Sequence, residues 1–113
     1  MLARENRLTG DSNFATVKKK GTLYQCPDVG VVIYNRNDDS PTRFGSIIST
    51  KISKMAVHRN RVARSLREAA RQNLTRIGKG YDIVFLAKKT ITNKTTDEIM
   101  SQIHTLFAEV FVK

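Results

Sequence analysis

Apolar residues recur at two different spacings along this chain of 113 residues, and these spacings divide it into strands and helices. The segment VGVVIYN at 29–35 and the segment YDIVFLAKK that begins at residue 81 are apolar on both faces, which is typical of strands in the middle of a sheet. The segment RFGSIIST at 43–50 predicts another strand. Since the turn-rich sequence RNDDSPT lies between 29–35 and 43–50, we expect these two strands to form a hairpin.

Helical spacing of apolar residues marks three other segments. In GDSNFATVKKKG, Asp11 or Ser12 can cap the first amide groups of a short helix, and Gly21 can close it in a left-handed conformation. A long helix is expected at about 56–76. The segment TTDEIMSQIHTLFAEVFVK predicts a final amphipathic helix.

The helix at 56–76 has two different sides. One side carries small and apolar residues together with one amide, namely Val62, Leu66, Ala69, Ala70 and Asn73. The opposite side carries a stripe formed by Arg64, Arg67 and Arg71. We therefore expect the first side to pack on the core and the second to be free to bind a partner.

The last segment begins with Thr95, and Glu98 follows three residues later. This is the spacing of a capping box, which indicates the start of a helix. The order of elements is then helix, strands, helix, strand, helix. We therefore expect an α+β fold, in which residues 1–113 form a single domain with about four strands in a mixed sheet packed with three helices.

The charges are strongly unbalanced, because twenty Lys and Arg residues oppose ten Asp and Glu residues and give a net charge of +10. Residues 43–80 alone hold ten basic residues and a single acidic one, Glu68. Such a patch attracts polyanions, since each phosphate that it neutralises releases condensed counterions. Nucleic acid is the expected partner, and a merely solvated basic surface is the alternative.

The chain offers few residues for catalysis of its own. The close carboxylate pair Asp38–Asp39 lies in a Ser-Pro turn sequence and favours a turn. His58 and His104 lack companions at metal-ligand spacing, and the lone Cys26 can form no internal disulfide. We predict no catalytic and no metal-binding residue. Because no apolar run reaches the length of a signal peptide or membrane span, we expect the protein in the cytoplasm, away from membranes.

One stretch carries a specific resemblance. RFGSIISTKISKMAVHRNRVARSLRE, residues 43–68, closely resembles the signature region of the bacterial ribonuclease P protein component, in which Arg-Asn-Arg lies inside a basic helix after a strand and a Lys-rich turn. RLTGDSNFATVKKKG resembles the first helix of that family, and GYDIVFLAKK with the last helix resembles its C-terminal half. The resemblance thus covers nearly the whole chain.

This resemblance implies a function and a topology. It implies the protein subunit of a ribonucleoprotein that removes the 5′ leader from precursor tRNA, with the catalytic Mg²⁺ ions held chiefly by the RNA subunit. The implied partners are ribonuclease P RNA and precursor tRNA, with a protein that is monomeric within the ribonucleoprotein. The resemblance also implies a left-handed crossover from the strand at 43–50 through the basic helix into the strand at 81–87, although general statistics favour a right-handed one.

Two binding surfaces follow from the resemblance, and the first is the basic helix. Carried over to this sequence, its contacts to the RNA subunit are Arg59, Asn60, Arg61, Arg64 and Arg67, with Lys51 and Lys54 adding charge from the preceding turn. Arginine suits this task because its planar fork can hold a phosphate through two parallel hydrogen bonds. For Arg59, a tertiary hydrogen bond to the sheet is the competing role.

The second implied surface is a cleft between the first helix and the sheet, which takes the single-stranded leader. Such RNA is held by aromatic faces and a basic groove. The candidates are Phe14, Lys18, Val32 and Tyr34. Lys18 stands where the family often has a second aromatic residue, so charge replaces stacking there, and the alternative role of Phe14 is in the core.

Two other functions stay open from the residues alone. A general RNA-binding or ribosomal-type module would have the same charge and fold, but it would bind unrelated structured RNAs equally well. A self-sufficient nuclease would need carboxylates gathered from distant positions, such as Asp82, Asp97 and Glu98, and it would cleave without an RNA partner.

Overall fold

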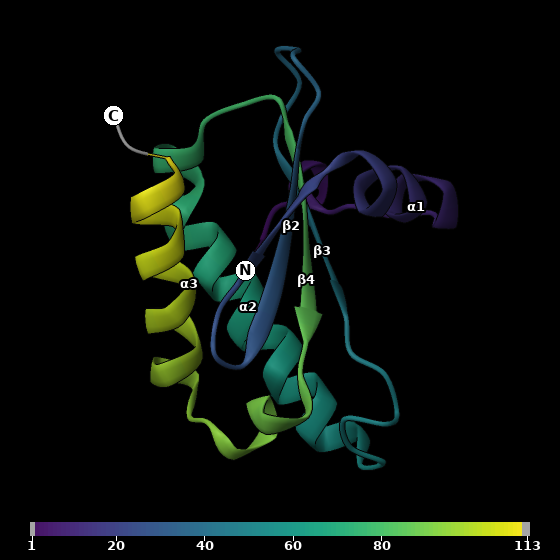
Figure 1. The fold of residues 1–113 in the computed structure, drawn as a ribbon, viewed down its shortest axis with the longest axis vertical. Helices are drawn as coiled ribbons and strands as arrows, with labels where there is room; N and C mark the ends of the chain where they lie inside the picture. The colour runs from purple at the N-terminus through teal and green to yellow at the C-terminus, as the bar shows by residue number, and fades with distance from the viewer. Residues whose placement is uncertain (1, 112–113) are drawn as a thin grey trace.

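Three α-helices, two 3-10 turns and four β-strands make up residues 2–111, the part of the chain that this computed structural model describes. In chain order they are η1 (Arg4–Asn6), α1 (Asp11–Lys20), β1 (Thr22–Gln25), β2 (Val29–Asn35), β3 (Arg43–Ile47), α2 (Ala56–Ile77), β4 (Tyr81–Ala87), η2 (Lys89–Asn93) and α3 (Thr96–Val110). The strands form one sheet in the spatial order β1-β2-β4-β3 (Figure 1). The predicted α+β fold is confirmed.

The sheet is mixed, and its strand order corrects one prediction. β2 pairs antiparallel with both β1 and β4, whereas β3 pairs parallel with β4. Because β4 lies between β2 and β3, the expected hairpin of 29–35 with 43–50 is wrong. The physical reason is the burial of β4: Ile83, Val84 and Phe85 are almost completely buried, and a strand that is apolar on both faces is favoured in the middle of a sheet that helices cover on both sides.

α2 makes the connection between the parallel strands β3 and β4. In Figure 1 both strands run downward, α2 passes behind the sheet, and β4 lies to the left of β3. This arrangement is the left-handed crossover that the resemblance implies, and it departs from the usual right-handed rule.

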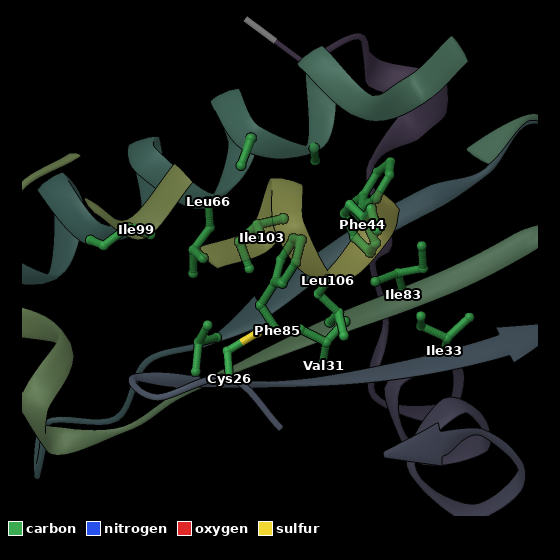
Figure 2. Packing of buried hydrophobic residues seen from close by; sticks show 14 of the residues in the cluster. Cys26, Val31, Ile33, Phe44, Leu66, Ile83, Phe85, Ile99, Ile103 and Leu106 are labelled. Atoms are coloured by element: carbon green, nitrogen blue, oxygen red, sulfur yellow. The ribbon is translucent and has the colours of Figure 1, made fainter. Parts of the chain in front are cut away.

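Apolar side chains gather on both faces of the sheet. On one face α2 and α3 pack over the strands, and Leu66, Phe85 and Ile103 lie at the centre of the cluster (Figure 2). All five residues predicted for the inner side of α2 are buried. On the other face α1 covers a smaller cluster formed by Leu8, Val17, Val32 and Val84. One side of α2 thus packs on the core, and the opposite side faces outward.

The two ends of α1 differ from the prediction. Its N-cap is Gly10, which has φ of 88°, and there is no side-chain cap from Asp11 or Ser12. Gly21 has φ of −79° and therefore does not close the helix in the left-handed region. Glycine is required there for a different reason, because a Cβ atom would lie 2.7 Å from Val32 Cγ1. The short residue lets the end of α1 lie directly on the sheet.

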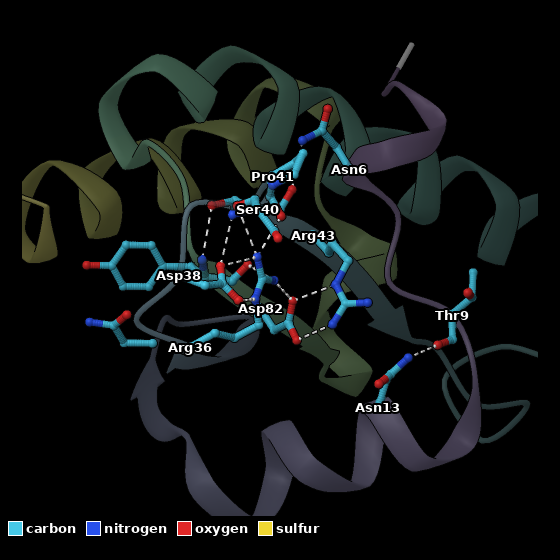
Figure 3. A network of polar contacts seen from close by, with 12 residues as sticks. Asn6, Thr9, Asn13, Arg36, Asp38, Ser40, Pro41, Arg43 and Asp82 are labelled. Carbon is cyan, nitrogen blue, oxygen red and sulfur yellow. Dashed lines mark hydrogen bonds and ion pairs between the residues drawn. The ribbon is translucent and has the colours of Figure 1, made fainter.

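The loop between β2 and β3 crosses the start of β4 and is fixed by a buried carboxylate. Asp82 is only 3% exposed, and both Arg36 and Arg43 form ion pairs with it (Figure 3). Arg43 Nη2 lies 2.7 Å from Asp82 Oδ2. The Arg36 guanidinium also donates to the backbone oxygens of Ser40 and Pro41. Two ion pairs to one buried carboxylate therefore join the loop to the sheet.

A second buried carboxylate joins the start of β2 to α3. Gln102 Nε2 donates to Asp28 Oδ2 at 2.6 Å, and the Asp28 backbone N–H donates to Gln102 Oε1 at 3.1 Å. Burial acts to raise the pKa of the Asp28 carboxyl, but hydrogen bonds with Thr90 and Gln102 and the charges of Lys94 and Lys88 outweigh it. The pKa of Asp28 therefore lies below its ordinary value.

Candidate nucleic-acid interface

The outward side of α2 carries the predicted basic stripe, and its three arginines are exposed. Asn60, Arg64 and Arg67 are exposed and line a shallow groove together with Val57 and Ala63. Within residues 2–111 the ion pairs engage only three arginines, Arg36, Arg43 and Arg71. The guanidinium groups of Arg64 and Arg67 thus have no acidic partner in that range and can bind an anion.

Arg71 is the third member of the predicted stripe, and it has a partner. Its guanidinium forms an ion pair with Glu68, one turn earlier, with Arg71 Nε 3.0 Å from Glu68 Oε2. The hydrogen bond from Arg71 lowers the pKa of the Glu68 carboxyl, and the same bond raises the pKa of Arg71. The unpaired part of the stripe therefore ends at Arg67.

Arg61 points to a neighbouring turn. Its Nη1 donates to the backbone oxygen of Lys94 at 2.9 Å, and its Nη2 donates to that of Thr92 at 3.0 Å. One turn later, Ser65 Oγ lies 3.0 Å from Thr96 Oγ1. These contacts hold η2 and the start of α3 against α2. Two of the five N–H donors of Arg61 are therefore used within the protein.

Arg59 has a comparable role on the other side of the helix start. Its Nη1 donates to the backbone oxygen of Ser53 at 2.6 Å, so the competing tertiary hydrogen bond exists, but it goes to the turn that precedes α2 and not to the sheet. Lys51 and Lys54 belong to this turn and are exposed. Arg59 thereby fixes the segment that presents the two lysines.

A pocket of about 250 Å³ lies beside the basic helix, between the N-terminal segment, α1 and β3. Phe14, Arg7 and Arg67 are among its lining residues. The Phe14 ring lies directly on the backbone of β3 at Gly45, where an added Cβ atom would overlap it. Since Arg67 lines both this pocket and the groove on α2, the two depressions adjoin.

Sequence reasoning did not assign Arg7 or Gly45 to a site. A signal for Gly45 does exist, because a glycine inside a strand often marks the close approach of another group. Arg7 gives no comparable signal, since it is placed by contacts between segments far apart in the chain. Its backbone bridges Phe44 in β3, and its side chain donates to the Leu2 oxygen at 3.0 Å.

The four leader candidates lie on the α1 face of the sheet or on α1 itself. Phe14 and Tyr34 are half-buried against the small apolar cluster, and Lys18 is exposed. Val32 shares their face but is only 5% exposed, because the end of α1 covers it. Tyr34 lines a separate groove with Tyr24. The structure therefore brings Phe14, Val32 and Tyr34 to one cluster but places Phe14 and Tyr34 in different depressions.

Two of the three carboxylates considered for an independent nuclease, Asp82 and Glu98, have other partners. Asp82 is held by two arginines, and Glu98 Oε1 accepts from the Thr95 backbone N–H at 3.2 Å in the predicted capping box. Among residues 2–111 no three His, Cys, Asp or Glu side chains are grouped so that they could hold a metal ion. In that same range no helix combines the length and the apolar character needed to cross a membrane.

Comparison with known sequences gives one consistent family. The family model described as Ribonuclease P matches residues 2–110. The ribonuclease P protein component of Pseudanabaena sp. is 32% identical over 112 residues, which cover 99% of this chain and 97% of that protein. That of Clostridioides difficile is 36% identical over 104 residues, with coverage of 91% and 90%.

Comparison with solved structures supports the same fold. The RNase P protein from Staphylococcus aureus matches with a TM-score of 0.83 and 24% identity, covering 93% of this chain and 94% of that one. The RNase P protein from Thermotoga maritima matches with a TM-score of 0.79 and 25% identity, covering 91% and 96%.

Proposed function

Since this chain belongs to the ribonuclease P protein family, we propose that it is the protein subunit of ribonuclease P and promotes removal of the 5′ leader from precursor tRNA by an RNA subunit. The observation that carries the proposal is the outward side of α2. Asn60, Arg64 and Arg67 are exposed there, while the opposite side of the helix is buried in the core. A rigid row of arginines is suited to bind the phosphates of a folded RNA.

The proposed RNA-subunit face consists of the seven predicted residues, which act in two ways. Asn60, Arg64 and Arg67 contact the RNA directly, and Lys51 and Lys54 add charge from the preceding turn. Arg59 and Arg61 fix the two turns that border the helix, as their bonds to backbone oxygens support. Each phosphate contact should contribute about 0.7 to 0.9 to the slope of log affinity against log salt concentration.

The proposed leader path begins at the pocket beside Arg67. There the half-buried Phe14 ring offers a face on which a base can stack, an interaction of about 1–3 kcal/mol. Lys18 and Tyr34 would act further along α1 and β2, and the buried Val32 would support them from below. The adjoining depressions support a leader that leaves the RNA-subunit face and enters the pocket directly.

Catalysis in this proposal depends on the RNA subunit, which chiefly holds the Mg²⁺ ions. The protein supplies cationic groups at fixed positions, and these replace part of the counterions that the RNA would otherwise need. The protein should therefore matter most at low magnesium concentration. We propose that it acts as a monomer within the ribonucleoprotein, in the cytoplasm, where its buried free Cys26 suits a reducing environment.

The test is cleavage of a precursor tRNA at low magnesium by a bacterial ribonuclease P RNA alone, by the protein alone, and by both together. We expect efficient cleavage only in the mixture, and a weaker effect of the Arg64→Ala variant. Cleavage by the protein alone would show a nuclease site that we have not assigned. If the mixture is no better than the RNA alone, and the protein binds unrelated structured RNAs equally well, it is a general RNA-binding module.

A further inference from the structure

Two apolar side chains are exposed at the start of the basic helix. Large hydrophobic residues that are exposed within the described part of the chain are Leu23, Ile47, Met55 and Val57. Met55 and Val57 are the most exposed of them, at 58% and 59%, and only one residue separates them in the sequence. Single exposed apolar residues need no explanation, but a pair beside a binding surface indicates a contact with a partner.

Val57 belongs to the binding side of α2. It precedes Asn60, Arg64 and Arg67 by three, seven and ten residues, which is the spacing of one helix face, and it lines the same groove. Its β-branched side chain has little rotamer freedom in a helix, so ordering it against a partner costs little entropy. Val57 is thus an apolar end to a row that is otherwise polar and cationic.

Met55 is fixed at its backbone and free at its side chain. Its N–H donates to Ser53 Oγ at 3.2 Å, and its oxygen accepts from the His58 N–H at 3.1 Å. The backbone of this N-cap residue is therefore held in place, while its flexible thioether side chain points to solvent and can adapt to a flat surface.

The chemistry around the pair selects its occupant. Lys54 directly precedes the pair in the sequence, and Asn60 and Arg64 share the groove with Val57. The partner must then present an apolar surface between negative groups, and a nucleobase that is unstacked from its neighbours has such a surface between its flanking phosphates. We propose that Met55 and Val57 form a contact for one unstacked base of the RNA subunit, an inference that rests on the proposed function.

The experiment compares affinities for ribonuclease P RNA over a series of potassium chloride concentrations. The double variant Met55→Ala/Val57→Ala should bind roughly tenfold more weakly at every salt concentration, because apolar contact area is lost. Its slope of log affinity against log salt should equal that of the wild type. Arg64→Ala should instead reduce the slope by about 0.7 to 0.9, the loss of one phosphate contact.

Matched variants separate this contact from damage to the fold. Leu23→Ala removes a side chain that is 51% exposed on β1, at the opposite edge of the sheet from β3, and should change neither affinity nor slope. Val57→Thr keeps the β-branched shape but not the apolar character, so it should weaken binding. Val57→Ile should bind as the wild type does. Thermal unfolding of all variants should stay near the wild-type midpoint, since the replaced side chains are exposed.

The outcomes distinguish this inference from the proposed function. If Arg64→Ala changes the slope and Met55→Ala/Val57→Ala binds as the wild type does, the base contact is refuted and the RNA-subunit face stands. A lowered slope in the double variant would also refute it, because the loss would then be electrostatic. If the wild type does not prefer ribonuclease P RNA over an unrelated structured RNA, the proposed function fails, and the base contact fails with it.

Discussion

Replacing Arg61 with alanine should mainly lower the stability of the folded protein and should not remove a direct contact with RNA. The Arg61 guanidinium bonds the oxygens of Thr92 and Lys94, and these bonds join two segments more than thirty residues apart in the chain. Ile91, which directly precedes Thr92 in η2, is completely buried. Loss of the arginine thus frees η2 at the point where it covers the core.

The size of the effect follows from the two bonds. A hydrogen bond with a charged partner contributes about 1.5–3 kcal/mol to stability. The Arg61 side chain is only half-buried, so water can replace part of what is lost at the two oxygens. We therefore expect Arg61→Ala to lower the free energy of unfolding by about 2–4 kcal/mol. Arg61→Lys should recover about half of this, because an ammonium group lacks the planar fork that reaches both oxygens.

Urea denaturation measures this difference, with Arg64→Ala as the matched control. Arg64 is exposed and has no acidic partner within residues 2–111, so its replacement should change stability by less than about 0.5 kcal/mol. Amide hydrogen exchange should also become faster around Lys94 in Arg61→Ala and stay unchanged in Arg64→Ala. The reasoning is refuted if Arg61→Ala is as stable as the wild type and lowers the salt slope of RNA binding as Arg64→Ala does.

Three further predictions concern two buried carboxylates and a glycine in β3. Asp82→Asn should lower the free energy of unfolding by about 3–5 kcal/mol, since two arginines lose their buried partner, whereas Asp39→Asn in the exposed loop should have no effect in the same urea titration. Because the pKa of Asp28 is lowered in the folded state, the ionised carboxyl stabilises the fold at a pH above its unfolded pKa of about 3.9. This contribution is lost as the pH falls through the folded pKa. In Asp28→Asn the free energy of unfolding should therefore fall less steeply between about pH 5 and 2 than in the wild type. Gly45→Ala should displace the Phe14 ring, cost about 1–3 kcal/mol and weaken binding of precursor tRNA more than binding of leaderless tRNA, which a pair of binding titrations would show.

Local patterns predicted the elements of this fold well, because each depends on residues close together in the chain. The two sides of α2 follow from a spacing of three and four residues, and the structure buries the predicted inner side completely. The capping box of Thr95 and Glu98 spans only three residues, and both of its hydrogen bonds are present. The resemblance to a known family was carried by residues 43–68 and is confirmed by the family match over 2–110.

Strand order was harder to predict from the sequence, because it depends on competition between segments that are distant in the chain. The segment RNDDSPT is compatible with a hairpin turn, but it also has the length to cross the start of a third strand. β4, which is more apolar than β3, lies between β2 and β3. Arg36, directly after β2, and Arg43, at the start of β3, both bind Asp82 of β4. The partners of those charges lie about forty residues away, beyond the reach of any local pattern.

The arginines of α2 show why a site can be located from sequence before its residues can be assigned roles. Arg59, Arg61, Arg64 and Arg67 share one side-chain chemistry, yet the first two bond backbone oxygens and the last two face solvent. Their roles differ through partners in the turns at either side of the helix. Loss of activity on replacing any of them therefore has two possible origins. Only stability and salt dependence measured on the same variants can separate an arginine that shapes the surface from one that binds RNA.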